Sequence, residues 1–409
     1  MCMEAYMNNI LDFSNCKRVH TYYGGSDRKF GVLYNNEVYM LKFSENHSKR
    51  SDISTSYVNN VVSEYISSHI SASIGLPTHD TLLGLYKDEI VVACKDFRQN
   101  QSIQNVEFAE YIRSKYDSKE VKRLIKLNQI YETLKDPEND IPLELQEASV
   151  ERFWDTFVVD ALVGNFDRHV GNWGYLVEGN NIKLAPIYDY GSTLFPQLSD
   201  EGMESIMTND FEIAKRCLVF PSPSLAITDE KVGKVGYYDM LSSNYDKNCT
   251  KAVLKIVPKI DMNKITDIIK NTPLITNTKK SFYTTILNAR KELIIDRAYL
   301  RCFNHNYDKD ALNRLQTGKQ FSEKDLTQYF KEREVAKVNF KNNKLSLEKM
   351  QSIDFIMENI KNPLQYQKDI SVLQAKQLQL SEQFGFNVSD ILKKSTYQKQ
   401  SLTVDDIEK

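Results

Sequence analysis

The sequence lacks the features that mark several common classes of protein. Its 53 Lys and Arg residues nearly balance its 55 Asp and Glu residues, and the net charge is −2, so there is no bulk positive charge for binding nucleic acid. No apolar run approaches the length that crosses a bilayer, and the N-terminal segment, with an early Glu, is not typical of a secretory signal. We therefore expect a cytoplasmic protein that binds neither nucleic acid nor a membrane directly, while export as an effector stays open.

Cysteine is also sparse and has no pattern. The six cysteines are scattered without the paired spacings of a zinc site or of a disulfide framework. They are typical of free thiols in a reducing compartment.

The chain is long enough for two or three domains, because 409 residues with 41% hydrophobic side chains can build sizeable cores. The pattern predicts an α+β fold with a small β-rich N-lobe over residues 1–97 that carries one helix. A helical C-lobe follows over 98–320, and a helical C-terminal extension over 321–409, where apolar residues from Leu347 to Ile360 recur at helical spacing. Within the C-lobe we expect helices over Val106–Arg113, Lys119–Leu134 and Leu145–Val163, a hairpin of Trp173–Val177 with Ile182–Pro186, and an irregular segment over 191–236.

The most informative stretch is the loop from Val163 to Gly174. It contains Asp167 and, five positions later, Asn172, and Asp189 follows after a largely apolar segment. Two carboxylates and an amide on consecutive loops can hold a divalent cation and orient a hydroxyl for attack on a phosphate. We predict that Asp167 is catalytic and that Asn172 and Asp189 bind Mg²⁺ or Mn²⁺.

The N-lobe contains residues suited to binding ATP, in the order that a kinase requires. A glycine-containing turn between two strands lets backbone N–H groups approach phosphates, a Lys follows on the next strand pair, and the helix predicted over Ser54–Ser73 carries a Glu that can orient this Lys. The last strand leads into a hinge whose backbone can meet adenine. The predicted ATP-binding residues are Gly24, Gly25, Ser26, Lys42, Glu64, Cys94 and Lys95.

Each of these residues also has a plainer interpretation. Gly24-Gly25 can be an ordinary turn, Lys42 a solubilising lysine on an edge strand, and Glu64 a solvated glutamate, while Asp167 with Asn172 can form a polar loop that caps the next strand. The complete set in the required order favours the kinase interpretation. We interpret His169 as structural, and Arg168 as a partner of Asp189 or of a phosphate.

The segments 164–174 and 185–191 resemble the HipA-like family of bacterial serine/threonine kinases. The resemblance implies a two-lobed fold related to protein kinases and to the phosphatidylinositol 3-/4-kinases, with Asp167 as the catalytic Asp, Asn172 and Asp189 on the metal and Lys42 on ATP. It also implies a compact member without the N-terminal subdomain that precedes the Gly-rich loop in full-length members.

Members of this family can be inactivated by autophosphorylation of a Ser in the Gly-rich loop. Ser26 occupies a comparable place and is the candidate, since a phosphate there would add negative charge beside the nucleotide. The alternative is a turn serine that bonds its own backbone.

The leading functional hypothesis is an ATP-dependent serine/threonine protein kinase that acts as a toxin or effector, with an antitoxin or a host protein as candidate partner. Two alternatives stay open: a phosphoinositide or small-molecule kinase, which shares this catalytic loop, and a nucleotide-binding scaffold.

Overall fold

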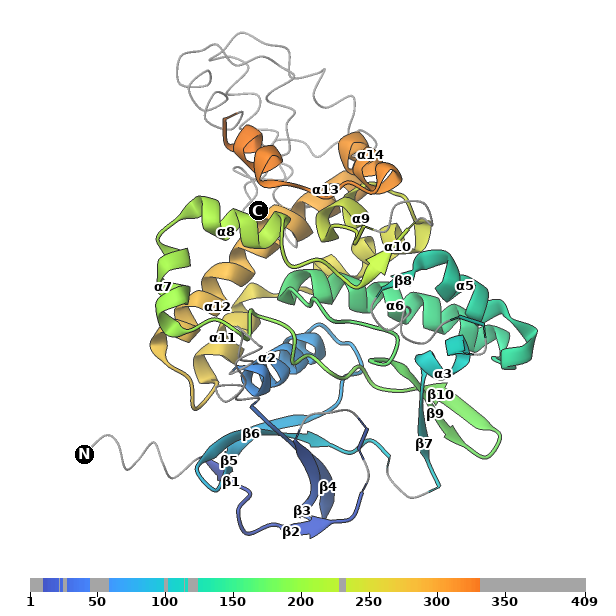
Figure 1. Cartoon of the computed structure of the whole chain (residues 1–409), viewed down its shortest axis with the longest axis vertical. Coiled ribbons are helices and arrows are strands. Elements are labelled where there is room, and N and C mark those ends of the chain that lie inside the picture. Colours follow the sequence, from blue (N-terminus) through green and yellow to red (C-terminus); the bar gives the residue numbers. More distant parts are fainter. Residues whose placement is uncertain are drawn as a thin grey trace, which may run out of the picture.

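The computed structural model describes residues 10–21, 23–24, 28–44, 59–98, 102–113, 115–116, 124–227 and 233–331. A curled sheet lies at one end of the molecule and a larger helical body at the other, with helix α2 (Asn60–Ser73) between them (Figure 1). The predicted amphipathic segment Leu347–Ile360 lies outside the described residues, and a short helical stretch, 323–331, is the last described part of the chain.

The six-stranded sheet has the spatial order β1-β5-β6-β4-β3-β2. Only the β1–β5 pair is parallel, and the other pairs are antiparallel. The strands are β1 Leu11–Asp12, β2 Lys17–Val19, β3 Lys29–Tyr34, β4 Glu37–Phe43, β5 Thr81–Tyr86 and β6 Glu89–Lys95.

Successive residues of β6 serve two different cores, because side chains alternate between the faces of a strand. Val91 and Ala93 join a small cluster inside the sheet lobe. Val92 and Cys94 face the other way and belong to the main core, which also contains the buried side of α2. The sheet and α2 are thus packed together by apolar contacts.

The helical lobe is built around α6 (Leu143–Val163), whose second half is almost entirely buried. Helices α10 (Lys247–Ile256) and α12 (Asn277–Arg290) and the π-helical segment η3 (Lys291–Asp296) pack against it. The remaining elements are β7 Gln104–Glu107, α3 Phe108–Arg113, β8 Ile125–Lys126, α5 Leu127–Lys135, η1 Pro137–Asn139, β9 Gly174–Glu178, β10 Asn181–Leu184, α7 Asp200–Met207, α8 Asp210–Leu218, β11 Leu225–Ala226, α9 Tyr237–Ser242, η2 Val257–Lys259, α11 Met262–Asn271, α13 Arg297–Phe303 and α14 Lys309–Thr317.

Two predictions for the segment before α6 were wrong in part. The helix expected to begin at Val106 begins at Phe108, because 104–107 form β7 and pair with β9. The approach is so close that a Cβ on Gly174 would lie 2.1 Å from the Val106 carbonyl oxygen. In the second segment, where a helix was expected over Lys119–Leu134, Ile125 and Lys126 form strand β8, which pairs with β11 before α5 begins. Such long-range pairing leaves no local helical or strand pattern from which to predict it.

The segment from 191 to 236 was expected to be irregular, and this was also wrong in part. It contains α7 and α8, which are capped at their N-termini by Ser199 and Asn209. The side chains of these two residues accept hydrogen bonds from first-turn N–H groups. The buried faces of these helices are short, and that of α7 consists of Met203 and Ile206. So few buried apolar residues give only a weak helical periodicity in the sequence.

Candidate active site

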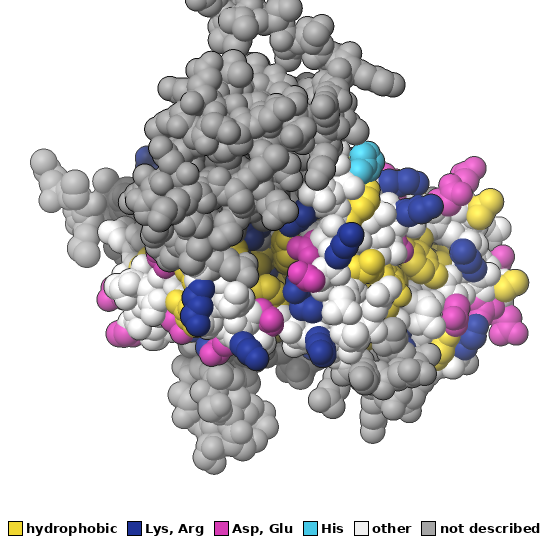
Figure 2. Space-filling model, turned by 90° about the horizontal axis from the view of Figure 1, so that it is seen from above, with side chains coloured by type: hydrophobic (Ala, Val, Ile, Leu, Met, Phe, Trp, Pro, Cys, Tyr) yellow, Lys and Arg dark blue, Asp and Glu magenta, His cyan; other side chains and the backbone are white. Residues whose placement is uncertain are grey.

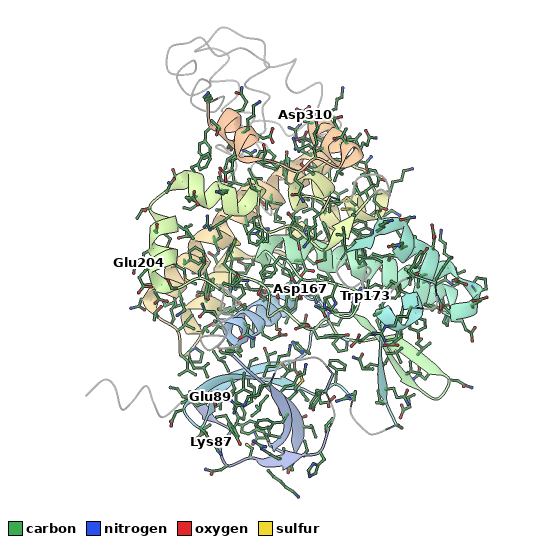
Figure 3. All side chains as sticks on the ribbon, viewed as in Figure 1. Lys87, Glu89, Asp167, Trp173, Glu204 and Asp310 are labelled. Carbon is green, nitrogen blue, oxygen red and sulfur yellow. The ribbon has the colours of Figure 1, made fainter. Side chains whose placement is uncertain are left out.

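The loop that carries Asp167 follows directly from the buried helix α6. Gly164 caps this helix with φ of 68°, a left-handed conformation that glycine adopts without steric cost. The chain then turns so that Asp167 lies on the side of the helical lobe that faces α2 and the sheet, near Trp173 (Figure 3). A rigid helix therefore delivers the loop to the region between the lobes.

Hydrogen bonds within the loop fix the spacing between Asp167 and Asn172. The Asn172 side-chain amide donates to the Asp167 carbonyl oxygen at 2.9 Å, and the Gly171 N–H donates to Nδ1 of His169 at 3.0 Å. The structural interpretation of His169 is confirmed, because its ring supports the loop backbone.

Arg168 pairs with Asp160, and not with Asp189, which was one of the two partners left open. The guanidinium donates from Nε to Asp160 Oδ2 at 2.9 Å and from Nη2 to Oδ1 at 3.1 Å. Nη1 donates to the carbonyl oxygens of Asn172 and Tyr188. Arg168 thus joins the catalytic loop to the residue just before Asp189. The sequence did not single out Asp160, because it lies within an apolar run of α6. A charged residue inside that run was the signal that could have indicated its role.

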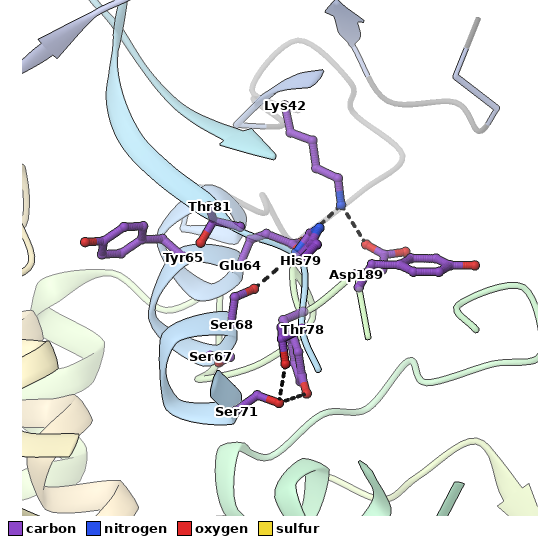
Figure 4. A network of polar contacts seen from close by, with 12 residues as sticks. Lys42, Glu64, Tyr65, Ser67, Ser68, Ser71, Thr78, His79, Thr81 and Asp189 are labelled. Atoms are coloured by element: carbon purple, nitrogen blue, oxygen red, sulfur yellow. Dashed lines mark hydrogen bonds and ion pairs between the residues drawn. The ribbon is translucent and has the colours of Figure 1, made fainter. Parts of the chain in front are cut away.

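Lys42, Glu64 and Asp189 come from three separate elements and meet at one point. Lys42 Nζ lies 3.0 Å from Glu64 Oε2 and 3.0 Å from Asp189 Oδ1 (Figure 4). The predicted contact between Lys42 and Glu64 is present. The additional contact with Asp189 connects the sheet to the helical lobe.

Glu64 has a second partner that the sequence did not suggest. Oε1 lies 3.0 Å from Nε2 of His79, and the same ring nitrogen lies 3.1 Å from the Ser68 hydroxyl (Figure 4). His79 follows α2 after a short connection, and both it and Glu64 are buried. The carboxylate is therefore held from two sides.

The surroundings keep Lys42 and Glu64 charged. Burial opposes the charge on Lys42, but Asp189 and Glu64 outweigh it and raise the pKa of the ammonium well above its ordinary value. Burial also opposes the charge on Glu64, but Lys42 and His79 outweigh it and lower the pKa of that carboxyl. Each charge depends on the others, as expected for a buried network.

Asp167 differs from Glu64 in its electrostatics. Its side chain reaches solvent, yet the protein packed around the loop removes hydration and raises the pKa of the carboxyl, and Asp189 raises it further while His169 opposes the shift. A raised pKa suits a carboxylate that must accept or orient a hydroxyl proton.

Asp189 has φ of 64°, in the left-handed region that Asp and Asn tolerate better than other side chains. Such backbone conformations persist only where the surroundings enforce them, and they are common at functional sites.

The other predicted ATP residues are placed less completely. Gly24 is exposed, and a Cβ there would meet nothing within 4 Å, while Gly25 and Ser26 lie outside the described residues. Next to Gly24, the Tyr23 hydroxyl donates to Asp96 at 3.0 Å. The residue before Gly24 is therefore bonded to the hinge, a contact that the sequence pattern did not indicate.

The hinge itself has fewer free backbone groups than expected. Cys94 is buried on the same side of the sheet as α2. The N–H groups of Lys95 and Asp96 donate to the Asp80 and Val38 carbonyl oxygens at 2.9 and 2.8 Å. These two donors are occupied within the lobe, so the predicted adenine contact rests on the other backbone groups of this segment.

The donor set fits a hard divalent cation. The amide nitrogen of Asn172 is engaged with the Asp167 carbonyl oxygen, which leaves the amide oxygen for a metal ion, and Asp189 contributes carboxylate oxygens on a side chain that is 42% exposed. Oxygen donors of this kind suit Mg²⁺ and Mn²⁺.

The face shown in Figure 2 carries Lys and Arg side chains interspersed with Asp and Glu among its described residues. No helix among the described residues is both long and apolar enough to span a membrane.

Comparisons with known proteins agree with this geometry. A family model described as the HipA-like C-terminal domain matches residues 21–257. The serine/threonine-protein kinase CtkA of Helicobacter pylori is 40% identical over 295 residues, which cover 71% of this chain and 88% of that protein.

Solved structures were also compared. The crystal structure of a proinflammatory kinase CtkA from Helicobacter pylori matches with a TM-score of 0.66 and 37% identity, covering 73% of this chain and 99% of that one. A complex of HipA, HipB and operator DNA from Shewanella oneidensis matches more distantly, with a TM-score of 0.41 and 15% identity over 66% of this chain and 64% of that one. The kinase-like α+β fold is confirmed by the first of these two matches.

Proposed function

The chain belongs to the HipA-like C-terminal domain family and is a serine/threonine-protein kinase, and from this premise we propose the roles of its residues. Lys42 contacts the phosphates of ATP, Asp167 orients the acceptor hydroxyl, and Asn172 and Asp189 hold the metal ion. The observation that carries the proposal is that Lys42 lies 3.0 Å from both Glu64 and Asp189, which brings a cation from the sheet to the loops of the helical lobe.

Phosphoryl transfer needs positioning and charge neutralisation more than covalent chemistry by the protein. Glu64, held by His79, keeps Lys42 extended between the lobes. Asp167 accepts or orients the proton of the attacking hydroxyl, and its raised pKa makes it a better base than an ordinary carboxylate. Arg168 and Asp160 fix the loop on which Asp167 lies.

ATP and a divalent metal are the cofactors that a kinase of this family uses, and we propose Mg²⁺ or Mn²⁺ as the ion. When bound, the ion neutralises charge on the transferring phosphate. Lys42 is already balanced by two carboxylates, so it can exchange Asp189 for a phosphate without becoming an unpaired charge, because Glu64 stays in contact.

We further propose that the physiological acceptor is a protein hydroxyl and that the chain acts as a toxin or effector, with an antitoxin or a host protein as its partner. The relative named as a serine/threonine-protein kinase supports a protein acceptor over a lipid.

The test is transfer of label from γ-labelled ATP in the presence of Mg²⁺, for wild type, Asp167→Asn and Asp189→Asn. Asp310→Asn is the control, since this carboxylate lies on α14 at the far end of the helical lobe (Figure 3). The acceptors are the chain itself, a generic basic protein and phosphoinositide vesicles. We expect label on protein that is lost in the two site variants and kept in the control. Equal labelling in all variants would refute the assigned roles, and label on vesicles alone would establish the lipid-kinase alternative.

A further inference from the structure

Helix α2 presents a row of serines to the helical lobe. Ser63, Ser67 and Ser71 recur at intervals of four residues, so they lie on one side of the helix, and each is fully buried at 0% exposure. Glu64 directly follows the first of them. Buried hydroxyls need partners, and the partners found here come from the loop after Asp189.

Thr193 is the centre of these contacts. Its hydroxyl donates to the Tyr190 carbonyl oxygen at 2.8 Å and lies 2.7 Å from the Ser67 hydroxyl. Because a hydroxyl has one proton to donate, Ser67 is the donor to Thr193. The Ser63 hydroxyl donates to the Thr193 carbonyl oxygen at 2.7 Å. One fully buried residue thus bonds both the helix that carries Glu64 and the residue next to Asp189.

The segment before Asp189 is fixed to the same part of the sheet lobe. The Ile187 N–H donates to the Pro77 carbonyl oxygen at 2.8 Å, and the His79 N–H donates to the Ile187 carbonyl oxygen at 3.0 Å. The Tyr190 hydroxyl donates to Ser71, which also accepts from Thr78 (Figure 4). The Asp189 loop is therefore attached to α2 and to its following segment on both sides.

We propose that Thr193 is a positioning residue of the kinase reaction. Through Tyr190 and Ser67 it sets the distance between Asp189 and Glu64, so that Lys42 meets two carboxylates whose separation is fixed before nucleotide binds. In this arrangement the Asp189 loop, α2 and the segment that follows α2 are held together by hydrogen bonds between buried groups. The inference rests on the proposed roles of Lys42 and Asp189.

The test compares Thr193→Val, which removes the hydroxyl and keeps the shape, with Thr193→Ser, which keeps the hydroxyl. The readouts are kcat/KM for ATP and the Mg²⁺ concentration for half-maximal activity. We expect Thr193→Val to lower kcat/KM roughly 10- to 100-fold, as for other residues that orient a metal ligand, and to raise the Mg²⁺ requirement. Thr193→Ser should restore both.

Thr250→Val is the matched control. Thr250 is a mostly buried threonine on α10 whose hydroxyl lies 2.8 Å from Asn244 Oδ1 and 3.3 Å from the Asp246 carbonyl oxygen. The Thr250→Val variant should have a lower thermal stability, but the Mg²⁺ requirement of the folded enzyme should not change. If Thr193→Val does not fold, Ser67→Ala provides the same test, because it removes the donor to Thr193.

Wild-type Mg²⁺ dependence and kcat/KM in Thr193→Val, or in Ser67→Ala where that variant replaces it, would overturn the proposal. That result leaves the proposed function intact, because wild type transfers phosphate in the same assay. Absence of transfer by wild type, by contrast, would refute the function itself.

Discussion

Arg168 and Asp160 form a two-point contact beneath the catalytic loop, with Nε to Oδ2 at 2.9 Å and Nη2 to Oδ1 at 3.1 Å. Their side chains are 8% and 1% exposed. Burial opposes the charge on Arg168, yet Asp160 outweighs it and raises the pKa of the guanidinium. Because the same guanidinium bonds the Asn172 and Tyr188 carbonyl oxygens, this ion pair supports both proposed metal-binding loops.

The first prediction concerns this pair. Asp160→Ala leaves Arg168 buried without its carboxylate, and we expect the free energy of unfolding to fall by about 3–5 kcal/mol. Urea denaturation measures it. Glu89→Gln is the control, because Glu89 pairs with Arg28 on the surface, where both side chains are about half exposed, and we expect a change of no more than about 1 kcal/mol. Equal effects for the two variants would contradict the role assigned to Asp160.

The second prediction concerns Lys42. Lys42→Met removes the cation between Glu64 and Asp189, and we expect kcat/KM to fall on the order of 10²- to 10³-fold, as when one preorganised electrostatic group is removed. Steady-state kinetics with ATP measures the change. The control is Lys87→Met, since Lys87 is an exposed lysine in the turn between β5 and β6, and its activity should stay near wild type. Full activity of the Lys42→Met variant would show that Lys42 does not contribute to catalysis or ATP binding.

The third prediction is a pH dependence. The pKa of Asp167 is raised above its ordinary value of 3.8, so the carboxylate becomes protonated, and loses its proposed function as a base, at a higher pH than usual. We expect kcat/KM to fall on the acid side with a midpoint above 3.8. Circular dichroism at each pH separates this loss from unfolding. A midpoint at or below the ordinary value in the folded enzyme would argue against Asp167 as the base.

The fourth prediction concerns the metal ion. Chelation should abolish transfer, and Mg²⁺ or Mn²⁺ should restore it. Asn172→Ala removes a proposed oxygen ligand, and we expect the Mg²⁺ concentration for half-maximal activity to rise roughly 10- to 100-fold. Titration of activity with free Mg²⁺ gives the value. Asn180→Ala, in the exposed turn between β9 and β10, is the control and should titrate like wild type. The same titration for both variants would exclude Asn172 as a ligand.

The fifth prediction is autophosphorylation of Ser26. Incubation of the wild-type chain with ATP, followed by phosphopeptide mapping, should find phosphate on Ser26 and a parallel loss of transfer to added acceptor. Ser26→Ala should keep its activity over the same period, because no phosphate repels the nucleotide. Phosphate at other sites only, with the activity loss unchanged in Ser26→Ala, would refute this.

The sequence by itself determined the parts of the site that depend on local order. The spacing of Asp167 and Asn172 within one short loop, and a later segment that returns Asp189, follow from chain connectivity. Helix α6 has a strong helical periodicity, and the hairpin between the two loops has a Gly-Asn-Asn turn at 179–181, so both were also predictable. The pairing of Lys42 with Glu64 followed once the kinase order of elements had been inferred.

Only the tertiary structure decided which partners these residues have. Asp160, His79 and Thr193 lie close to Arg168, Glu64 and Tyr190 in space, but their own sequence surroundings resemble those of ordinary core residues. Burial gives them their importance, because a buried charge or hydroxyl must find a partner, and that partner can come from any part of the chain. The attachment of α2 to the loop after Asp189 has the same physical origin. In the sequence, the serines of α2 give no indication of a partner, and they form hydrogen bonds with this loop only because it packs against the helix.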